Sequence, residues 1–145
     1  MAFKPPPLFV DTWGWLALED HKEPRHHQSV AIRRAQTDDG GRLVTTDYVL
    51  DETFTRLFAR RPFPEAERFS DRIFQTEHAG LLSIEPITRQ RFEDAFRLRL
   101  RYRDKPRISF TDLTSFVVMK ELGIRQVLTA DAHFAKAHLG FQLLP

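Results

Sequence analysis

The chain has 145 residues, the length of one ordinary domain with a buried core, which leaves no room for a second domain. Hydrophobic residues make up 41% and charged residues 29%, and together with 13 phenylalanines this composition excludes a disordered chain. Cysteine is absent, which excludes disulfides and thiolate metal sites, and no stretch is apolar enough for a signal peptide or for a membrane span of ~20 residues, so we expect a cytoplasmic protein.

The formal net charge is only +2, but the sequence pI is near 9.2 and arginines gather in one late segment. Such a distribution indicates a polyanionic partner. The alternative is a solvated helix face, because no aromatic platform typical of single-strand binders is evident around these arginines. The residues concerned are Arg89, Arg91, Arg97, Arg99, Arg101, Arg103 and Arg107.

Predicted strands and helices alternate along the chain. Short apolar runs predict strands at residues 8–10, 42–46, 81–86, 126–129 and 141–144. Helical periodicity predicts helices at residues 12–18, 26–36, 47–60, 64–78, 88–102 and 110–122, and a short one from residue 133. No repeat or linker interrupts this alternation. We therefore expect one α/β domain over residues 1–145, with a parallel sheet and helices on both of its faces.

Three aspartates stand where strands end or where a helix begins. Asp11 follows the first strand, Asp131 follows the 126–129 strand, and Asp112 lies in the first turn of the 110–122 helix that Ser109 opens. In an open α/β sheet the carboxyl ends of strands and the amino ends of helices share the edge that binds ligands. The alternative for Asp112 and Asp131 is a capping or helix-dipole role.

A fourth acid lies in the helix that follows the second strand. Glu52 is about one and a half turns into this helix, and Asp47 is interpreted as its cap. Asp51 lies about 100° around the helix from Glu52, so the two carboxylates cannot face the same point. Glu52 is therefore the candidate that joins the other acids.

Several α/β chemistries are excluded by missing motifs. Neither the dinucleotide-binding nor the phosphate-loop fingerprint occurs, and there is no Gly-x-Ser-x-Gly elbow. Four acids at one sheet edge would repel one another unless hard cations lay among them, and clusters of oxygen ligands suit Mg²⁺ or Mn²⁺. Such ions activate water and hold a phosphodiester in line. The pattern therefore favours metal-assisted hydrolysis of nucleic acids.

Four segments, in this order and at these separations, carry a family resemblance. The chain resembles the PIN-domain ribonucleases, and in particular the toxins of VapBC-type toxin-antitoxin pairs. The resemblance covers nearly the whole chain and implies a three-layer α/β/α domain with a mostly parallel central sheet of about five strands. The segments are Leu8-Phe9-Val10-Asp11-Thr12-Trp13-Gly14-Trp15, Thr46-Asp47-Tyr48-Val49-Leu50-Asp51-Glu52-Thr53, Ser109-Phe110-Thr111-Asp112 with Ser115-Phe116-Val117-Val118-Met119, and Leu128-Thr129-Ala130-Asp131-Ala132-His133-Phe134.

The resemblance implies an endoribonuclease that depends on Mg²⁺ or Mn²⁺ and cleaves single-stranded RNA. Asp11 and Asp112 would be the core metal ligands, and Glu52 and Asp131 would complete the site directly or through water. A homodimer and a small antitoxin that blocks the active site are implied as well. Three hydroxyl residues match positions that often help to hold the metal or the scissile phosphate in this family: Thr12, Ser115 and Thr129.

Two other functions remain open. One is a PIN-like domain that only binds RNA or protein, although four mutually repelling acids argue against a disused site. The other is a metal-dependent nuclease that acts on DNA. The sequence does not select among transfer, ribosomal and messenger RNA as the substrate. A neighbouring gene for a DNA-binding antitoxin would favour the toxin.

Overall fold

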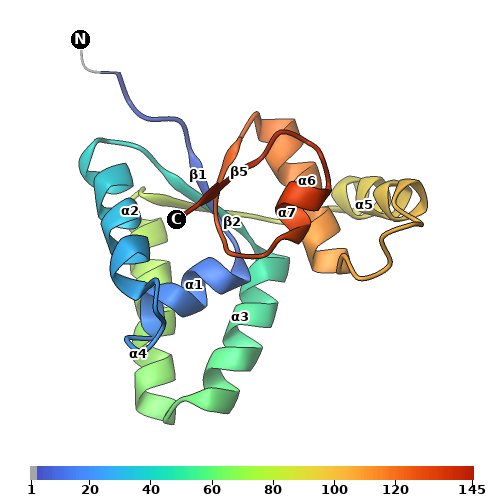
Figure 1. Ribbon diagram of the computed structural model, residues 1–145. Coiled ribbons are helices and arrows are strands. Elements are labelled where there is room, and N and C mark those ends of the chain that lie inside the picture. The colour runs from blue at the N-terminus through green and yellow to red at the C-terminus, as the bar shows by residue number, and fades with distance from the viewer. Residues whose placement is uncertain (1–2) are drawn as a thin grey trace.

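The computed structural model describes residues 3–145, so the first two residues of the expected domain lie outside the described part. Within it, strands and helices alternate as the sequence predicts (Figure 1). No helix among these residues has the length and apolar character needed to cross a membrane. The elements are β1 (Leu8–Val10), α1 (Thr12–Glu19), α2 (His26–Asp38), β2 (Leu43–Thr46), α3 (Asp47–Arg60), α4 (Phe63–His78), β3 (Leu82–Glu85), α5 (Arg89–Arg101), α6 (Phe110–Leu122), β4 (Gln126–Leu128), α7 (His133–Lys136) and β5 (Gln142–Leu144).

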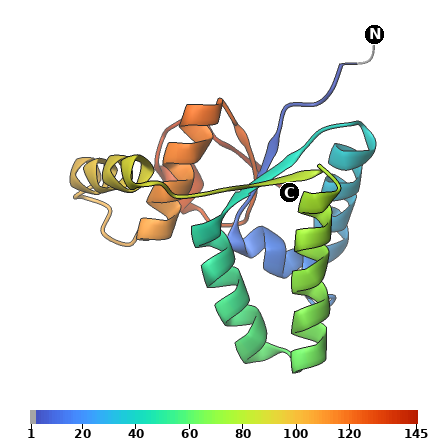
Figure 2. The same ribbon diagram turned by 180° about the vertical axis from the view of Figure 1, so that it is seen from behind.

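The strands form one five-stranded sheet in the order β3-β2-β1-β4-β5, and every neighbouring pair is parallel. The chain leaves β1 toward β2 and β3, then returns to β4 and continues to β5 on the other side of β1. Because parallel crossovers are right-handed, this reversal places α1–α4 on one face and α5–α7 on the other (Figures 1 and 2). The predicted three-layer α/β/α fold is confirmed.

The central strands are buried on both faces, as expected for a parallel sheet covered by helices. Leu8, Phe9 and Val10 of β1 are fully buried, which explains the uninterrupted apolar run in this strand. On the α6 side, Phe116 packs edge-on against Phe134 with the ring centroids 5.0 Å apart. This core fixes α6 and the short α7 against the end of the sheet that carries the acids.

The predicted ends of α6 are confirmed. Ser109 precedes the helix, and its Oγ accepts a hydrogen bond of 3.0 Å from the backbone N–H of Asp112. Gly123 ends the helix with φ at +69°, a left-handed conformation that glycine adopts without strain. The capping hydroxyl therefore belongs to Ser109, which leaves the Asp112 carboxylate available to the site.

The interpretation of Asp47 as the cap of α3 is wrong. Strand β2 runs directly into the helix, so Thr46 is the last extended residue, and its Oγ1 accepts the N–H of Val49 at 3.0 Å. Asp47 is already helical, and its Oδ1 accepts the N–H of Ile87 at 2.9 Å. The residue at the junction of a strand and a helix depends on the exact strand end, which the sequence pattern does not define.

The crowded arginines do not form a uniform solvated face. Arg91 is buried and pairs with Glu85 at 3.1 Å and Glu121 at 3.0 Å. No aromatic platform was evident among these arginines in the sequence, but the structure exposes two rings on α5, Phe92 at 39% and Phe96 at 54%. These rings lie four residues apart and share one helix face, a relation that depends on the rotation of α5 in the fold.

Candidate active site

A cleft of about 390 Å³ opens at the carboxyl edge of the sheet. It lies where the strand order reverses, between the ends of β1 and β4, which is where open α/β sheets bind ligands. All four acids predicted from the sequence line this cleft: Asp11, Glu52, Asp112 and Asp131. The sheet topology thus brings together residues that are 120 positions apart in the chain.

Asp11 follows β1 directly and is only 4% exposed. The Thr129 hydroxyl donates a 2.9 Å hydrogen bond to Asp11 Oδ2, and Thr129 Oγ1 also accepts the N–H of Asp131 at 3.0 Å. Burial raises the pKa of Asp11 to about 7, and the charges of Asp112 and Asp131 add to the rise. The hydrogen bonds from Thr12 and Thr129 oppose this rise but do not cancel it.

Asp112 projects from the first turn of α6 and is 6% exposed. Burial raises its pKa to about 6, with a further contribution from the charge of Asp131. Contacts with His133 and Ser109 lower the pKa in part. Asp11 and Asp112 are thus two buried carboxyl groups beside each other, and no Lys or Arg pairs with either of them among the described residues.

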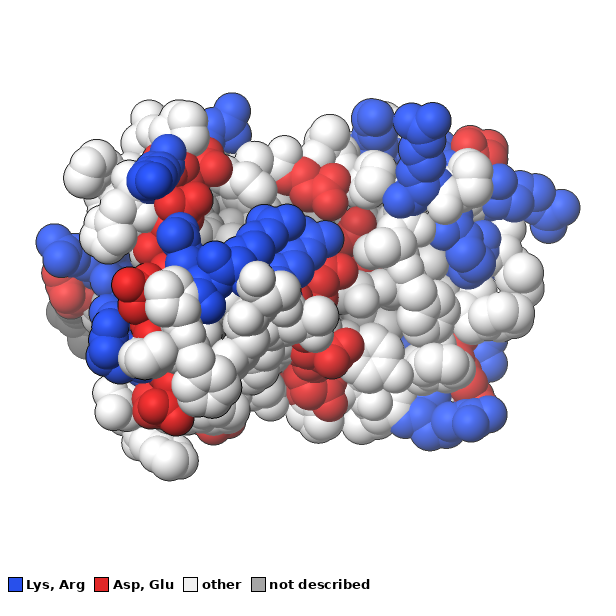
Figure 3. All heavy atoms as spheres, turned by 90° about the horizontal axis from the view of Figure 1, so that it is seen from below, with Lys and Arg blue, Asp and Glu red and all other residues white. Residues whose placement is uncertain are grey.

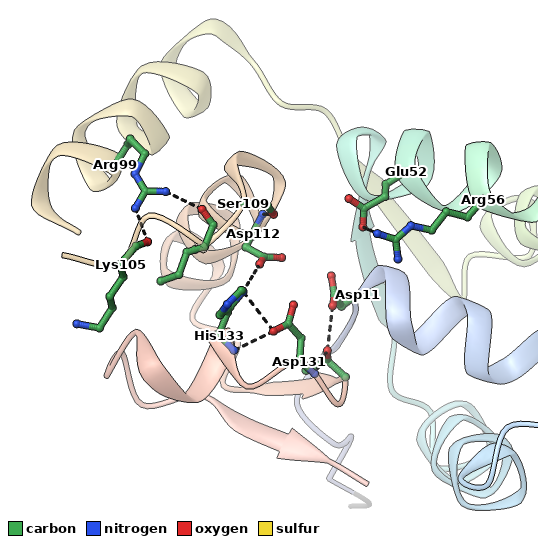
Figure 4. A network of polar contacts seen from close by, with 11 residues as sticks. Asp11, Glu52, Arg56, Arg99, Lys105, Ser109, Asp112, Asp131 and His133 are labelled. Atoms are coloured by element: carbon green, nitrogen blue, oxygen red, sulfur yellow. Dashed lines mark hydrogen bonds and ion pairs between the residues drawn. The ribbon is translucent and has the colours of Figure 1, made fainter. Parts of the chain in front are cut away.

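A histidine completes a tight group with two of the acids (Figure 4). His133 Nδ1 lies 3.3 Å from Asp112 Oδ2 and 3.3 Å from Asp131 Oδ1. One ligand atom from each of Asp112, Asp131 and His133 fits within 4.8 Å of the others. Asp131 Oδ1 also accepts the backbone N–H of His133 at 2.9 Å. Asp131 therefore accepts a backbone N–H at the start of α7, as the capping alternative expects, and it also lines the cleft.

Glu52 faces the same cleft from α3, across from this group (Figure 4). Its side chain is 34% exposed, and Oε1 lies 3.9 Å from Arg56 Nη2. Glu52 is not part of the three-residue group of Asp112, Asp131 and His133. The structure therefore brings it to the opposite wall of the cleft rather than into close contact with the other acids.

The PIN domain family matches residues 8–138, which include every residue of this cleft. The chain belongs to the PIN-domain family. Its five-stranded parallel sheet, covered by helices on both faces, is the fold that the resemblance of the sequence implies.

Two curated relatives are VapC proteins. The PIN domain is 30% identical over 130 residues to the 23S rRNA-specific endonuclease VapC20 of Mycobacterium tuberculosis, with 90% of this chain and 93% of the relative covered. It is 26% identical over 132 residues to a VapC ribonuclease of Archaeoglobus fulgidus, with 90% of this chain and 81% of the relative covered. The VapC-like resemblance is confirmed.

Two solved structures share the fold. The crystal structure of the M. tuberculosis VapC20, a toxin that cleaves the sarcin-ricin loop, superposes with a TM-score of 0.75 at 29% identity and covers 90% of this chain and 95% of its own. The VapBC2 structure of Rickettsia felis, bound to a promoter DNA fragment, has a TM-score of 0.70 at 14% identity and covers 94% and 96%. At that identity the second likeness concerns the fold alone.

The residues of the PIN domain fit a divalent cation. Two buried carboxyl groups with raised pKa values repel each other, and a cation between them would relieve that repulsion. The Thr12 hydroxyl lines the cleft, is buried and has no hydrogen-bond partner within residues 3–145. Ser115 Oγ is likewise buried without a partner there, but Ser115 does not line the cleft. Among the three hydroxyl residues, Thr12 lines the cleft, and Thr129 contacts the site through its hydrogen bond to Asp11.

Sequence reasoning missed His133 as a site residue. It stands in a four-residue helix, where no periodic pattern shows which way a ring points. The available signal is its position two residues after Asp131. An aspartate side chain often accepts the backbone N–H of the second following residue, and this turn brings the two residues close together. Arg107, which also lines the cleft, belongs to the arginine-rich segment noted in the sequence, whereas Arg56 gave no signal.

Proposed function

We propose that this PIN domain, acting as one unit over residues 1–145, is an endoribonuclease that depends on Mg²⁺ or Mn²⁺ and serves as the toxin of a VapBC-type pair. The observation that carries the proposal is the group of carboxylates at the switch point of the sheet, two of them buried without a Lys or Arg partner in the described chain. The names of the VapC relatives support RNA as the substrate.

Asp11, Asp112, Asp131 and His133 would hold the ion. When bound, the ion lowers the pKa of a water ligand and offsets negative charge on the phosphate oxygens. Glu52 faces the same space from the opposite wall, and its carboxylate would accept a proton from an attacking water. Hydrolysis adds a hydroxyl to phosphorus and a proton to the leaving oxygen. Arg56 and Arg107 line the cleft and would attract the negatively charged strand toward the acids.

The function is tested with labelled single-stranded RNA and DNA, incubated with the purified chain in Mg²⁺, in Mn²⁺ and in EDTA. We expect internal cleavage of RNA in either ion and none in EDTA. Cleavage that persists in EDTA would contradict the metal mechanism, and cleavage of DNA alone would favour the DNA nuclease. Binding of RNA without cleavage in any ion would favour a domain that only binds.

An antitoxin, a homodimer and a cytoplasmic location belong to the same proposal. An RNA-cleaving toxin needs an inhibitor in its own cell, and the R. felis relative is solved as a VapBC complex.

Phe92, Phe96 and Leu100 recur every four residues on α5 and are exposed, which offers a face to a second copy. We expect expression of the chain alone to stop growth, co-expression of the adjacent antitoxin to restore it, and light scattering to give twice the mass of 17.0 kDa.

A further inference from the structure

A second hollow lies beside the catalytic cleft and has a volume of about 280 Å³. It is lined by the 104–108 segment, which joins α5 to α6, and by residues of α7. Arg107 and His133 line both spaces, so the hollow and the cleft are adjacent. A strand of substrate that lies across the acids would therefore also pass over this hollow.

The hollow is cationic although it borders the acidic group. Arg107 and Lys136 are exposed and make no ion pair or side-chain hydrogen bond within residues 3–145. Lys105 Nζ lies 3.0 Å from Asp104 Oδ2, so the charges of that pair cancel. Two positive charges remain. Figure 3 shows acidic side chains in the middle of this face, with Lys and Arg side chains beside them and on both sides, including the α5 side.

Apolar atoms lie beside these cations. Pro106 is exposed and Ile108 is buried beneath the hollow, and both line it. A nucleotide has the matching chemistry, because its phosphate suits exposed cations while the face of its base packs on apolar surface. A strongly acidic peptide would use the two cations but would have less use for the apolar part.

The segment that carries Arg107 is held rigidly. The guanidinium of Arg99 donates to three backbone carbonyls of this segment, at 2.6 Å to Ile108, 2.7 Å to Tyr102 and 2.6 Å to Lys105. The Tyr102 hydroxyl donates to the carbonyl of Ala137 at 2.8 Å, which ties the segment to the end of α7. The two walls of the hollow are therefore fixed to each other before any ligand arrives, which lowers the cost of ordering on binding.

We propose that this hollow is an RNA subsite that binds a nucleotide flanking the scissile bond, with its phosphate held by Arg107 and Lys136 and its base against Pro106. The inference rests on the proposed function, since it assigns part of the substrate path. Arg107 and Lys136 should therefore contribute equally to the affinity for RNAs of different base sequence.

The test measures binding of a labelled single-stranded RNA by fluorescence anisotropy in EDTA, over a range of salt concentrations. The double variant Arg107→Ala/Lys136→Ala is compared with the wild type. Neutralising one phosphate of a single strand adds about 0.7 to the slope of log K against log salt, so loss of the two cations that hold this phosphate lowers the slope by about 0.7. The same slope is read from kcat/KM in Mn²⁺, which applies whether or not the metal-free chain binds tightly.

A matched control removes two cations elsewhere. Lys120 and Arg125 are exposed near the end of α6 and before β4, at the opposite edge of the sheet. The variant Lys120→Ala/Arg125→Ala makes the same change in net charge and should keep the wild-type slope. All variants should melt at the wild-type temperature, because the four side chains are exposed.

Each other outcome overturns the inference. A wild-type slope in Arg107→Ala/Lys136→Ala, beside a wild type that cleaves RNA, rejects the subsite and leaves the proposed function intact. A wild-type slope together with an altered melting response to Mn²⁺ would mean that Arg107 balances the acids instead. Loss of antitoxin binding with RNA binding unchanged would assign the hollow to the protein partner. A wild type that neither binds nor cleaves RNA would reject the proposed function and this inference together.

Discussion

At the scale of single residues, Asp11 and Asp112 are the two carboxyl groups of the site that are hardest to ionise. A carboxylate that is buried without a cation resists ionisation, and burial together with neighbouring charge raises the pKa to about 7 for Asp11 and about 6 for Asp112. Both groups therefore bind protons more tightly in the folded chain than in the unfolded chain. A bound cation would reverse this preference, because it favours the ionised form.

The stability of the metal-free chain should therefore fall as the pH rises. The contribution of these carboxyl groups is complete below their unfolded pKa of 3.8 and is lost as the pH rises through about 6 for Asp112 and about 7 for Asp11. Urea unfolding in EDTA at pH 5 and pH 8 measures the difference. Asp11→Asn should reduce the difference, whereas Asp51→Asn, which removes an exposed carboxylate, should preserve it. Equal pH dependence in wild type and Asp11→Asn would show that Asp11 is ionised normally.

Asp112→Asn separates a metal ligand from a structural residue. Because Ser109 makes the cap of α6, the substitution should leave the melting temperature in EDTA unchanged or raise it at neutral pH, since a mutual repulsion is removed. A cation at 100 times its Kd stabilises a folded chain by about 2.7 kcal/mol, and the variant should lose most of the stabilisation that Mn²⁺ gives the wild type. A variant that melts lower in EDTA and responds normally to Mn²⁺ would make Asp112 structural.

At the scale of elements, the segment between α5 and α6 depends on one side chain. The guanidinium of Arg99 has several N–H donors in one plane, and it donates to three backbone carbonyls at once. It thereby fixes both the start of α6, where Asp112 lies, and the wall of the second hollow. Arg99 is thus structural, in contrast to exposed arginines on the same helix.

Arg99→Ala should lower the free energy of unfolding by about 2 kcal/mol, the range for hydrogen bonds made by charged groups. Amide exchange in residues 102–108 should become faster. Arg97→Ala on the same helix is the matched control, because Arg97 is 65% exposed and a surface change of this kind stays within about 0.5 kcal/mol. Denaturant unfolding and hydrogen exchange measure both effects. Equal stability of the two variants would show that the Arg99 contacts contribute nothing to the fold.

The elements were predictable from their apolar patterns, and several of them end beside a Gly or Pro, as α6 does at Gly123. Asp11, Asp112 and Asp131 were predictable as neighbours because strand ends and helix starts share an edge. Features that depend on rotation or on an exact boundary were not. They include Thr46 in place of Asp47 as the cap, the position of Glu52 on the far wall, and the direction of the His133 ring.

At the scale of the whole molecule, the sheet order sets where chemistry can occur. The reversal between β1 and β4 opens the cleft, and the buried core holds α6 and α7 so that their acids and histidine meet there. Acidic side chains lie in the middle of this face, and Lys and Arg side chains lie around them on both sides (Figure 3). On the proposed function, this face would bind the RNA strand, with a phosphate at the acidic group.

On the proposed function, the carboxylates at the switch point hold a divalent ion that RNA cleavage requires. The most direct measurement is the initial rate of single-stranded RNA cleavage in saturating Mn²⁺, for the wild type and for Asp112→Asn. Asparagine keeps the shape of the side chain but loses its charge, so the account predicts a rate lower by about three powers of ten or more, with the fold retained. A rate in Asp112→Asn equal to that of the wild type would contradict it.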